Sequence, residues 1–236
     1  MEYFKWKNWD LINNFGLPSE YEIDYFESIM RSIPGLKISD ARCLEVGFGN
    51  GGFLGFCNQR GISVVGIEIQ ERLINAAHDS GFEAYSSISL VPDEKRFNLI
   101  IAIDVLEHIK KPELIDFLRS LVHKTTPQDD AFIVLRFPNG DSPFSMLNQN
   151  GDLTHQTYIG SAAIAYIAQS LNLEVIKLGG DIFPYRPNYL VANGTNLLRR
   201  ILYACINLLV KVIFQRGKTV DFCSENLLVV LKHKVE

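Results

Sequence analysis

Two kinds of hydrophobic pattern alternate along most of this chain. Short apolar runs predict buried strands, at 41–46, 62–68, 82–86, 97–103, 131–137, 173–178 and 226–231. Apolar residues spaced by three or four positions predict helices, at about 19–33, 51–59, 70–79, 111–124 and 158–171. Strands and helices that alternate in this way predict an α/β fold, with a doubly wound, mostly parallel sheet that helices cover on both faces.

The segment 181–224 does not follow this alternation. After an irregular stretch with two prolines, a helix is predicted at 196–215, with a narrow polar stripe formed by Arg199, Tyr203, Asn207, Lys211 and Gln215. The rest of its surface is apolar and needs a cover, which can be the protein's own body, a second subunit in a homodimer, or a membrane interface. Basic residues on and beside the helix agree with peripheral contact to anionic lipid, but the pattern leaves all three partners open.

Composition limits the class of protein. The chain has 236 residues, of which 47% are hydrophobic and 21% charged, as in ordinary globular domains. Its net charge of −4 gives no sign of a nucleic-acid binder. From residue 181 onward the balance is +4, whereas residues 1–180 carry −8. This asymmetry is either chance variation or a surface that meets acidic partners.

The cysteines and the first residues bear on the compartment. Cys43, Cys57, Cys205 and Cys223 contain no CxxC pair, which favours reduced thiols over a disulfide framework or a zinc site. The first residues lack the apolar core of a signal peptide. No stretch reaches about 18 uninterrupted apolar residues. We therefore expect a cytoplasmic protein, with the helix at 196–215 as its one feature suited to the inner face of a membrane.

A glycine-rich turn follows the first strand of the sheet. Gly47, Gly49 and Gly51 stand directly after the apolar run that ends at Val46, and a helix follows. Glycines permit a tight turn and a close approach of backbone to a ligand, and the N-terminus of the next helix favours negative charge. Residues 47–52 also satisfy Gly-x-Gly-x-x-Gly, the fingerprint of dinucleotide-binding dehydrogenases.

Three acidic residues extend this candidate site. Glu45 precedes the turn, where its carboxylate can meet an ammonium group, and Glu68 ends the second strand, where it can accept hydrogen bonds from ribose hydroxyls. Asp104 ends the strand at 97–103. Each has a structural alternative, because Glu45 and Glu68 can be solvated surface acids and Asp104 can cap a turn.

These motifs resemble the class I S-adenosylmethionine-dependent methyltransferases. The resemblance rests on Leu44-Glu-Val-Gly-Phe-Gly-Asn-Gly, Gly66-Ile-Glu68 and Asp104-Val-Leu-Glu-His-Ile109, the last of which is similar to the ubiquinone-pathway branch. It covers about residues 38–180 and the final strand. It implies a seven-stranded, Rossmann-like sheet with an antiparallel last strand. The implied domains are an N-terminal helical cap at 1–40 and a methyltransferase domain at 41–236, with 181–224 as a helical insertion.

The resemblance also implies how the donor S-adenosylmethionine is bound. Gly47, Gly49, Asn50 and Gly51 are then residues around its methionine part, with Glu45 near the amino group.

On the nucleoside side, the resemblance assigns Glu68 to the ribose hydroxyls and Ile69 to the adenine. Asp104 is assigned to the methionine end, near the transferable methyl. The family often has an acidic residue beside the adenine after the third strand, but Ala84-Tyr-Ser-Ser-Ile88 has none. Ser86 or backbone then takes that contact.

The methyl acceptor is less defined. A hydroxyl acceptor needs a base, and His108 and His155 follow the fourth and fifth strands, in polar loops where we expect acceptor chemistry or hydrogen-bonding support. The loop with Asn139 and Asp141 offers further polar contacts, unless it is only a turn. No set of residues at metal-ligand spacing stands out, so we expect no metal site, although Asp141, Asp152 and a substrate oxygen leave a divalent ion open.

A looser resemblance concerns bacterial methyltransferases of surface-polysaccharide synthesis. It rests on the segment Asp152-Leu-Thr-His155, on the basic, amphipathic insertion and on the closing strand. It implies O-methylation of a sugar or lipid-linked saccharide, with a quinone-like or other small hydroxylated molecule as the nearest competitor. A nicotinamide-dependent oxidoreductase and a non-catalytic S-adenosylmethionine-binding module remain as alternative functions.

Overall fold

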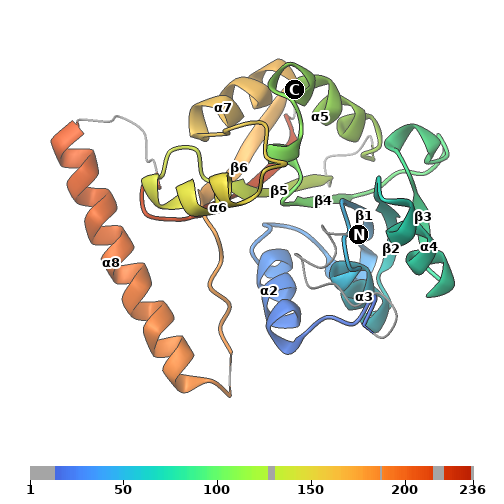
Figure 1. Ribbon diagram of the computed structural model, residues 1–236, viewed down its shortest axis with the longest axis horizontal. Helices are drawn as coiled ribbons and strands as arrows, with labels where there is room; N and C mark the ends of the chain where they lie inside the picture. The colour runs from blue at the N-terminus through green and yellow to red at the C-terminus, as the bar shows by residue number, and fades with distance from the viewer. Residues whose placement is uncertain (1–13, 127–130, 187, 215–220, 235–236) are drawn as a thin grey trace. The chain divides into compact units, whose positions relative to one another are not determined.

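A seven-stranded sheet organises the chain (Figure 1). The computed structural model describes residues 14–126, 131–186, 188–214 and 221–234. The strand order is β3-β2-β1-β4-β5-β7-β6. The strands are β1 Arg42–Val46, β2 Ser63–Ile67, β3 Glu83–Tyr85, β4 Leu99–Ile103, β5 Phe132–Pro138, β6 Leu173–Gly180 and β7 Asn226–His233.

The pairing confirms the predicted α/β fold. β1 pairs in parallel with β2, and β2 with β3. β7 runs antiparallel to both β5 and β6, as the family resemblance implies for the last strand. Each predicted strand is present within two residues of its expected bounds, because a buried strand needs an uninterrupted apolar run that is easy to recognise.

The helices depart from the sequence prediction in two places. They are α2 Glu20–Arg31, α3 Gly52–Gln59, α4 Glu71–Asp79, α5 Leu114–His123, α6 Met146–Gly151, α7 Ser161–Ser170 and α8 Leu190–Phe214. Short 3-10 turns are η1 Ile38–Asp40, η2 Ile88–Leu90, η3 Leu106–His108, η4 Lys111–Glu113 and η5 Pro143–Ser145. α6 was not predicted, since its six residues are too few for a helical period. α8 begins six residues before the predicted start.

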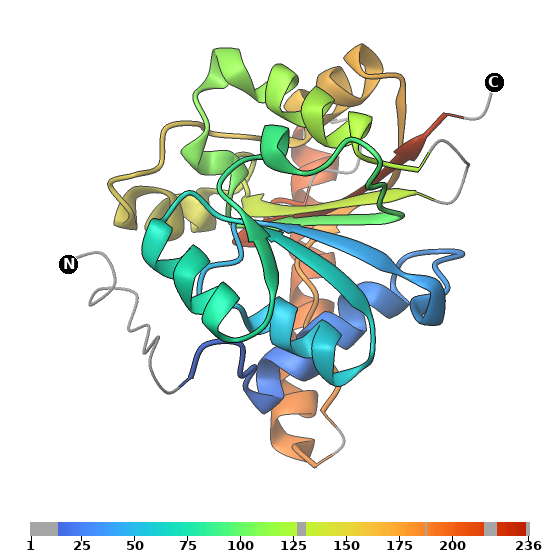
Figure 2. The same ribbon diagram turned by 90° about the vertical axis from the view of Figure 1, so that its right-hand side faces the viewer.

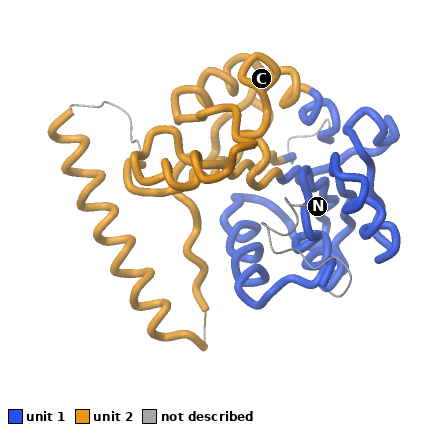
Figure 3. Tube along the Cα trace, viewed as in Figure 1, with its two compact units in different colours: residues 1–101, 120–131 blue, residues 102–119, 132–236 orange. Residues whose placement is uncertain are grey.

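The chain divides into two compact units, Met1–Ile101 with Ser120–Ala131, and Ala102–Arg119 with Phe132–Glu236 (Figure 3). We call them unit 1 and unit 2. This division differs from the predicted cap and catalytic domain, which stay a prediction. The first thirteen residues of that cap, and residue 215 of the predicted insertion helix, lie outside the described residues.

Unit 1 packs α2 beside α3, as the two ribbon views show (Figures 1 and 2). A capping box between Ser19 and Glu22 begins α2. The ring of Phe26 meets the rings of Phe53 and Phe56 on α3 at centroid distances of 5.2 Å and 5.6 Å. These buried aromatic contacts fix the helix that follows the glycine turn.

A close backbone approach holds the loop before α2 against α3. A Cβ atom at Gly55 would lie 1.7 Å from the carbonyl oxygen of Gly16, so only glycine permits this contact. The Gly16 amide donates to the carbonyl of Asn50 at 2.9 Å. The loop therefore braces the glycine turn from outside the sheet.

Unit 2 buries the central residues of β5 and β7 and packs α7 on β6. Phe137, Ile164 and Val229 are among its buried apolar residues. Polar residues of the loop after β5 serve this packing. Asn139 is fully buried and donates to the carbonyls of Asp221 and Ser224, and Asp141 accepts from the amide of Ser161 at the start of α7.

α8 is attached to unit 2 by its polar side. The guanidinium of Arg200 donates to the Phe183 carbonyl at 2.7 Å, and Tyr203 contacts the Phe183 ring. The side chain of Asn207 accepts from the Phe222 amide at 2.8 Å and donates to Asp221. No side chain of α8 is buried.

Large apolar side chains of α8 are exposed. Among its exposed residues are Leu197, Leu198, Ile201, Leu202, Leu208, Leu209, Val212, Ile213 and Phe214. Which of the three expected partners covers this apolar face stays a prediction. In the part of the chain that the structure describes, no helix has the length and apolar character needed to cross a bilayer.

Candidate functional site

The glycine turn after β1 adopts a conformation that ordinary side chains avoid. Gly47, Gly49 and Gly51 have φ angles of 72°, 52° and 77°, in the left-handed region that favours glycine. A Cβ atom at Gly51 would lie 2.7 Å from the Phe15 ring. α3 begins at the next residue, so its unpaired N-terminal amides lie at this turn.

Glu45 is a buried carboxylate at the end of β1. Its Oε2 has no hydrogen-bond partner among the described residues. Burial, followed by the negative charges that Cys43 and Glu68 carry when ionised, raises the pKa of Glu45 well above its usual range, and a hydrogen bond from the Leu54 backbone opposes the rise. A buried carboxyl oxygen without a partner fits an ammonium group of a ligand.

Glu68 joins the glycine turn to the end of β2. Its Oε2 accepts from the Gly49 amide at 3.2 Å, and its Oε1 accepts from the Gln70 amide at 3.0 Å. The side chain is buried, so these bonds hold its orientation. Each carboxylate oxygen has a further lone pair for a hydroxyl donor.

The other residues predicted at this site lie at its margin. Ile69 follows Glu68, and its side chain is 84% exposed, which leaves an apolar surface beside the carboxylate. Ser86 follows β3 and is exposed. Asn50 is half-buried within the turn. All of these residues belong to unit 1 and surround the ends of β1, β2 and β3.

Asp104 lies in unit 2, directly after β4. It has a φ of 55°, which is uncommon for a residue with a side chain. Its Oδ2 accepts from the guanidinium of Arg136 at 2.9 Å, and the same guanidinium donates to Asp181 at 2.8 Å. The following turn η3 has Val105 at its N-cap and no side-chain cap, so Asp104 pairs with Arg136 rather than capping this turn.

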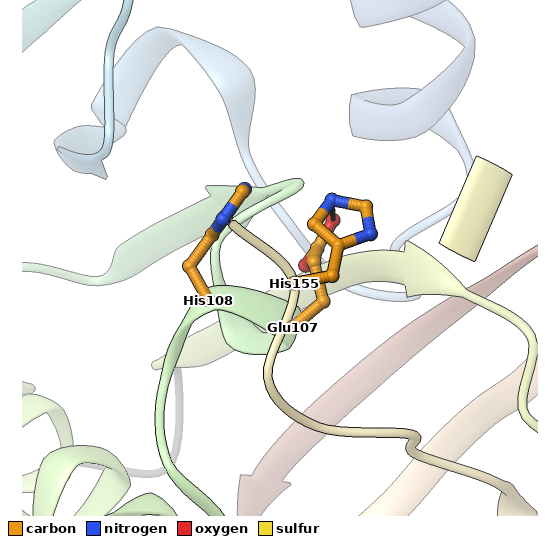
Figure 4. A group of neighbouring side chains, drawn as sticks. All are labelled: Glu107, His108 and His155. Carbon is orange, nitrogen blue, oxygen red and sulfur yellow. Dashed lines mark ion pairs between the residues drawn. The ribbon is translucent and has the colours of Figure 1, made fainter. Parts of the chain in front are cut away.

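His108 and His155 come together in unit 2, beside the buried carboxylate of Glu107 (Figure 4). Their ring centroids are 4.7 Å apart, with an interplanar angle of 72°. Nε2 of His155 lies 3.9 Å from Oε1 of Glu107 and 3.9 Å from Oδ2 of Asp152. One possible ligand atom of each of Glu107, His108 and His155 lies within 4.8 Å of the others.

Hydrogen bonds assign the neutral tautomer of both rings. Nδ1 of His155 lies 3.0 Å from the Gln149 carbonyl, which can only accept, so Nδ1 carries the proton. The Thr154 hydroxyl donates its one proton to Asp152 at 2.6 Å. Nδ1 of His108, at 3.0 Å from that hydroxyl oxygen, is therefore also a donor. Each neutral imidazole then presents the lone pair of Nε2.

The sequence predicts both histidines as residues of an acceptor site, but it does not predict the residues that orient their rings. Glu107 adjoins His108 in the chain, and its burial is the feature that sequence reasoning did not predict. Thr154 and Gln149, which hydrogen-bond to the two rings, lie some forty residues beyond His108 in the chain. Asp141, expected at an acceptor site, instead accepts from the Ser161 amide at the start of α7.

Comparisons with known proteins identify the family and the fold of this chain. A model described as a methyltransferase domain matches residues 20–178. A search of curated protein sequences finds no match. Three similar solved structures are methyltransferases, each under 25% identical and thus informative about the fold alone.

An S-adenosylmethionine-dependent methyltransferase from Archaeoglobus fulgidus is 19% identical, with a TM-score of 0.61, over 89% of this chain and 94% of that chain. One from Clostridium acetobutylicum is 10% identical, with a TM-score of 0.60, over 100% of both chains. Magnesium protoporphyrin IX methyltransferase from Synechocystis, solved with S-adenosylmethionine bound, is 11% identical, with a TM-score of 0.53, over 90% and 78%.

The raised pKa of Glu45 predicts a pH-dependent stability. Its folded-state pKa exceeds the ordinary value of 4.5, so the folded chain loses stability as the pH rises from about 4.5 through that higher value. Glu45→Gln removes the charge at every pH. Its free energy of unfolding should therefore match the parent's at pH 4 and exceed it at pH 8, by about 1.4 kcal/mol per unit of pKa rise.

Denaturant unfolding of both ligand-free proteins between pH 4 and pH 8 measures this difference. Glu71→Gln, at an exposed position of α4, is the matched control and should show no such trend. A difference for Glu45→Gln that does not grow with pH contradicts the assignment of a buried, destabilised carboxylate.

Proposed function

The chain belongs to the class I S-adenosylmethionine-dependent methyltransferases, and from this premise we propose that it methylates a hydroxyl oxygen of a sugar or another small hydroxylated acceptor. Family membership favours this activity over that of a nicotinamide-dependent oxidoreductase, which shares the glycine fingerprint. The observation that carries the choice of an oxygen acceptor is the pair of histidines whose neutral rings present Nε2 lone pairs.

The residues of unit 1 suit the donor. The orphaned Oε2 of Glu45 suits the amino group of its methionine part, and Gly47, Gly49 and Gly51 let backbone approach it closely. The two oxygens of Glu68, already aligned by backbone amides, suit the ribose hydroxyls. The exposed side chain of Ile69 suits the adenine face.

Asn50, Ser86 and Asp104 complete the proposed set. Asn50 and Ser86 lie beside the residues just described, at the turn and after β3. For Asp104 the support is the family resemblance, together with the unusual backbone conformation that Arg136 helps to hold. S-adenosylmethionine supplies an already activated methyl group, so positioning is the main task of these residues.

The acceptor side requires a base. A sugar hydroxyl is a weak nucleophile until its proton is withdrawn, and a neutral imidazole is suited to this near pH 7. We assign proton uptake to Nε2 of His155 or of His108. The acceptor oxygen then bonds to the methyl carbon as the methyl–sulfur bond breaks, and the electron pair of that bond stays on sulfur.

The exposed apolar surface of α8 bears on where in the cell the protein binds its acceptor. Its polar side bonds to Phe183 and Phe222 of unit 2, and its large apolar side chains are exposed. Residues 190–214 contain Arg199, Arg200 and Lys211 and no acidic residue. An apolar surface flanked only by positive charge complements an anionic lipid surface. We therefore favour peripheral membrane contact over a homodimer, which agrees with a lipid-linked saccharide of surface-polysaccharide synthesis as acceptor.

Ligand-induced stabilisation tests the donor assignment. S-adenosylmethionine and S-adenosylhomocysteine should raise the melting temperature, and NAD should not, because ligands that bind only the folded state stabilise it. Glu68→Ala should abolish the shift from both adenosyl ligands, since it removes both proposed ribose acceptors. Differential scanning fluorimetry measures these shifts.

Glu83→Ala serves as the control for this series, because it removes a glutamate of β3 that pairs with Lys95 on the surface. It should keep the full shift. Stabilisation by NAD alone would refute the donor, and an undiminished shift in a folded Glu68→Ala protein would refute the role of Glu68.

Vesicle binding tests the role of α8. The full chain should co-sediment with vesicles that contain phosphatidylglycerol and much less with pure phosphatidylcholine. Leu209→Asp should weaken binding at least tenfold, because burial of a leucine side chain contributes about 1.5–3 kcal/mol. Leu90→Asp is the matched control, since Leu90 is 57% exposed and Leu209 58% exposed.

The exposed thiol of Cys205 provides a second readout in the middle of α8. An environment-sensitive dye attached there should shift its emission to shorter wavelength with anionic vesicles. A stable dimer that binds no vesicles, or a monomer that binds none, contradicts the membrane proposal.

A further inference from the structure

We propose that Glu107, His108 and His155 bind a divalent transition-metal ion, beside the carboxylate of Asp152. This site lies wholly in unit 2, where η3 and the loop between α6 and α7 meet (Figure 4). The amide of Gln156 donates to the Glu107 carbonyl at 2.7 Å, and the side chain of Gln156 donates to the His108 carbonyl at 3.0 Å. Two segments distant in sequence are thereby held together by a backbone and a side-chain hydrogen bond.

The tautomers of the histidines suit metal binding. Histidines that bind a metal through one ring nitrogen usually donate the other N–H to a carbonyl, a carboxylate or another fixed acceptor, which orients the ring. Here Nδ1 of His155 donates to the Gln149 carbonyl, and Nδ1 of His108 donates to the Thr154 hydroxyl. Thr154 is itself fixed by Asp152, which accepts from its amide at 2.9 Å and from its hydroxyl. Nε2 of His155 is the ring nitrogen that lies beside the carboxylates of Glu107 and Asp152.

The separations are close to those of a metal site. Ligand atoms of a tetrahedral zinc site, each about 2.1 Å from the ion, lie about 3.4 Å apart. Nε2 of His155 is 3.9 Å from Oε1 of Glu107 and 3.9 Å from Oδ2 of Asp152. These two pairs are about half an ångström wider than that spacing, and the ligand atoms of Glu107, His108 and His155 all lie within 4.8 Å of one another. Binding of an ion draws these side chains closer together.

The charge balance also favours a cation. The side chains of Glu107, Asp152 and His155 are 2%, 6% and 8% exposed. Two carboxylates drawn from water beside neutral imidazoles are costly unless a positive charge accompanies them. Imidazole and carboxylate together suit zinc, iron or manganese ions better than magnesium or calcium, which prefer oxygen ligands alone.

Such an ion would activate the acceptor hydroxyl, a role that rests on the proposed function. Coordination of an acceptor hydroxyl lowers its pKa, as it does for water bound to zinc. One Nε2 lone pair cannot bind a cation and take up a proton at once. With the ion bound, the hydroxyl proton therefore passes to solvent, and the bonds that form at carbon and break at sulfur are unchanged.

Cobalt binding tests the site without any acceptor. The untagged full chain, stripped with a chelator, is titrated with Co²⁺ while its visible absorption is recorded, and Zn²⁺ is then added. We expect one equivalent of Co²⁺ per chain, visible ligand-field bands and their loss as Zn²⁺ replaces it. His155→Gln and Glu107→Gln should each weaken Co²⁺ binding at least tenfold.

His123→Gln, on an exposed residue of α5, is the matched control and should bind Co²⁺ like the parent. Far-ultraviolet circular dichroism shows whether each variant folds. His108→Gln gives an independent third test, because its half-exposed ring is the one least needed for packing. Absence of Co²⁺ binding by the parent overturns the proposal, and so does equal binding by all folded variants.

Parallel measurement of S-adenosylmethionine binding separates this inference from the proposed function. A chain that binds S-adenosylmethionine but no Co²⁺ loses only the metal site. A chain that binds one Co²⁺ through these residues but no S-adenosylmethionine loses the proposed methyl donor and keeps the metal site.

Discussion

The hydrogen bond from the Gly49 amide to the Glu68 carboxylate joins the turn after β1 to the end of β2, and the proposed donor site depends on it. The turn can donate this amide only because its glycines adopt the left-handed conformation. The second oxygen of Glu68 is held by the Gln70 amide, so the carboxylate is aligned before any ligand arrives. Preorganised acceptors of this kind reduce the entropic cost of binding.

In unit 2, side-chain hydrogen bonds likewise orient polar groups before a ligand binds. Gln149, Thr154 and Asp152 fix the tautomers of two histidines, so that both present the same nitrogen. That arrangement is the basis of the proton uptake and of the cation binding that we propose for a hydroxyl acceptor. α8 is held by polar residues instead of apolar ones. Its exposed apolar side chains are the basis of the proposed membrane contact.

Most of the fold could be predicted because strands with both faces buried give continuous apolar runs, and glycine at 47, 49 and 51 is itself the signal of an unusual turn. α6 could not, since six residues carry no helical period. The amphipathic pattern of α8 identifies its apolar face but does not determine which face contacts the body. The residues around Glu107 could not be predicted either, because their geometry depends on two loops that meet only in three dimensions.

We expect the ends of β1 and β2 to bind S-adenosylmethionine through Glu45, the glycine turn and Glu68. A crystal structure of the full chain with S-adenosylhomocysteine tests it most directly. We expect both ribose hydroxyls within hydrogen-bond distance of the Glu68 carboxylate and the amino group beside Glu45. Ribose and amino groups bound by other residues, with Glu68 still bonded only to Gly49 and Gln70, would contradict it.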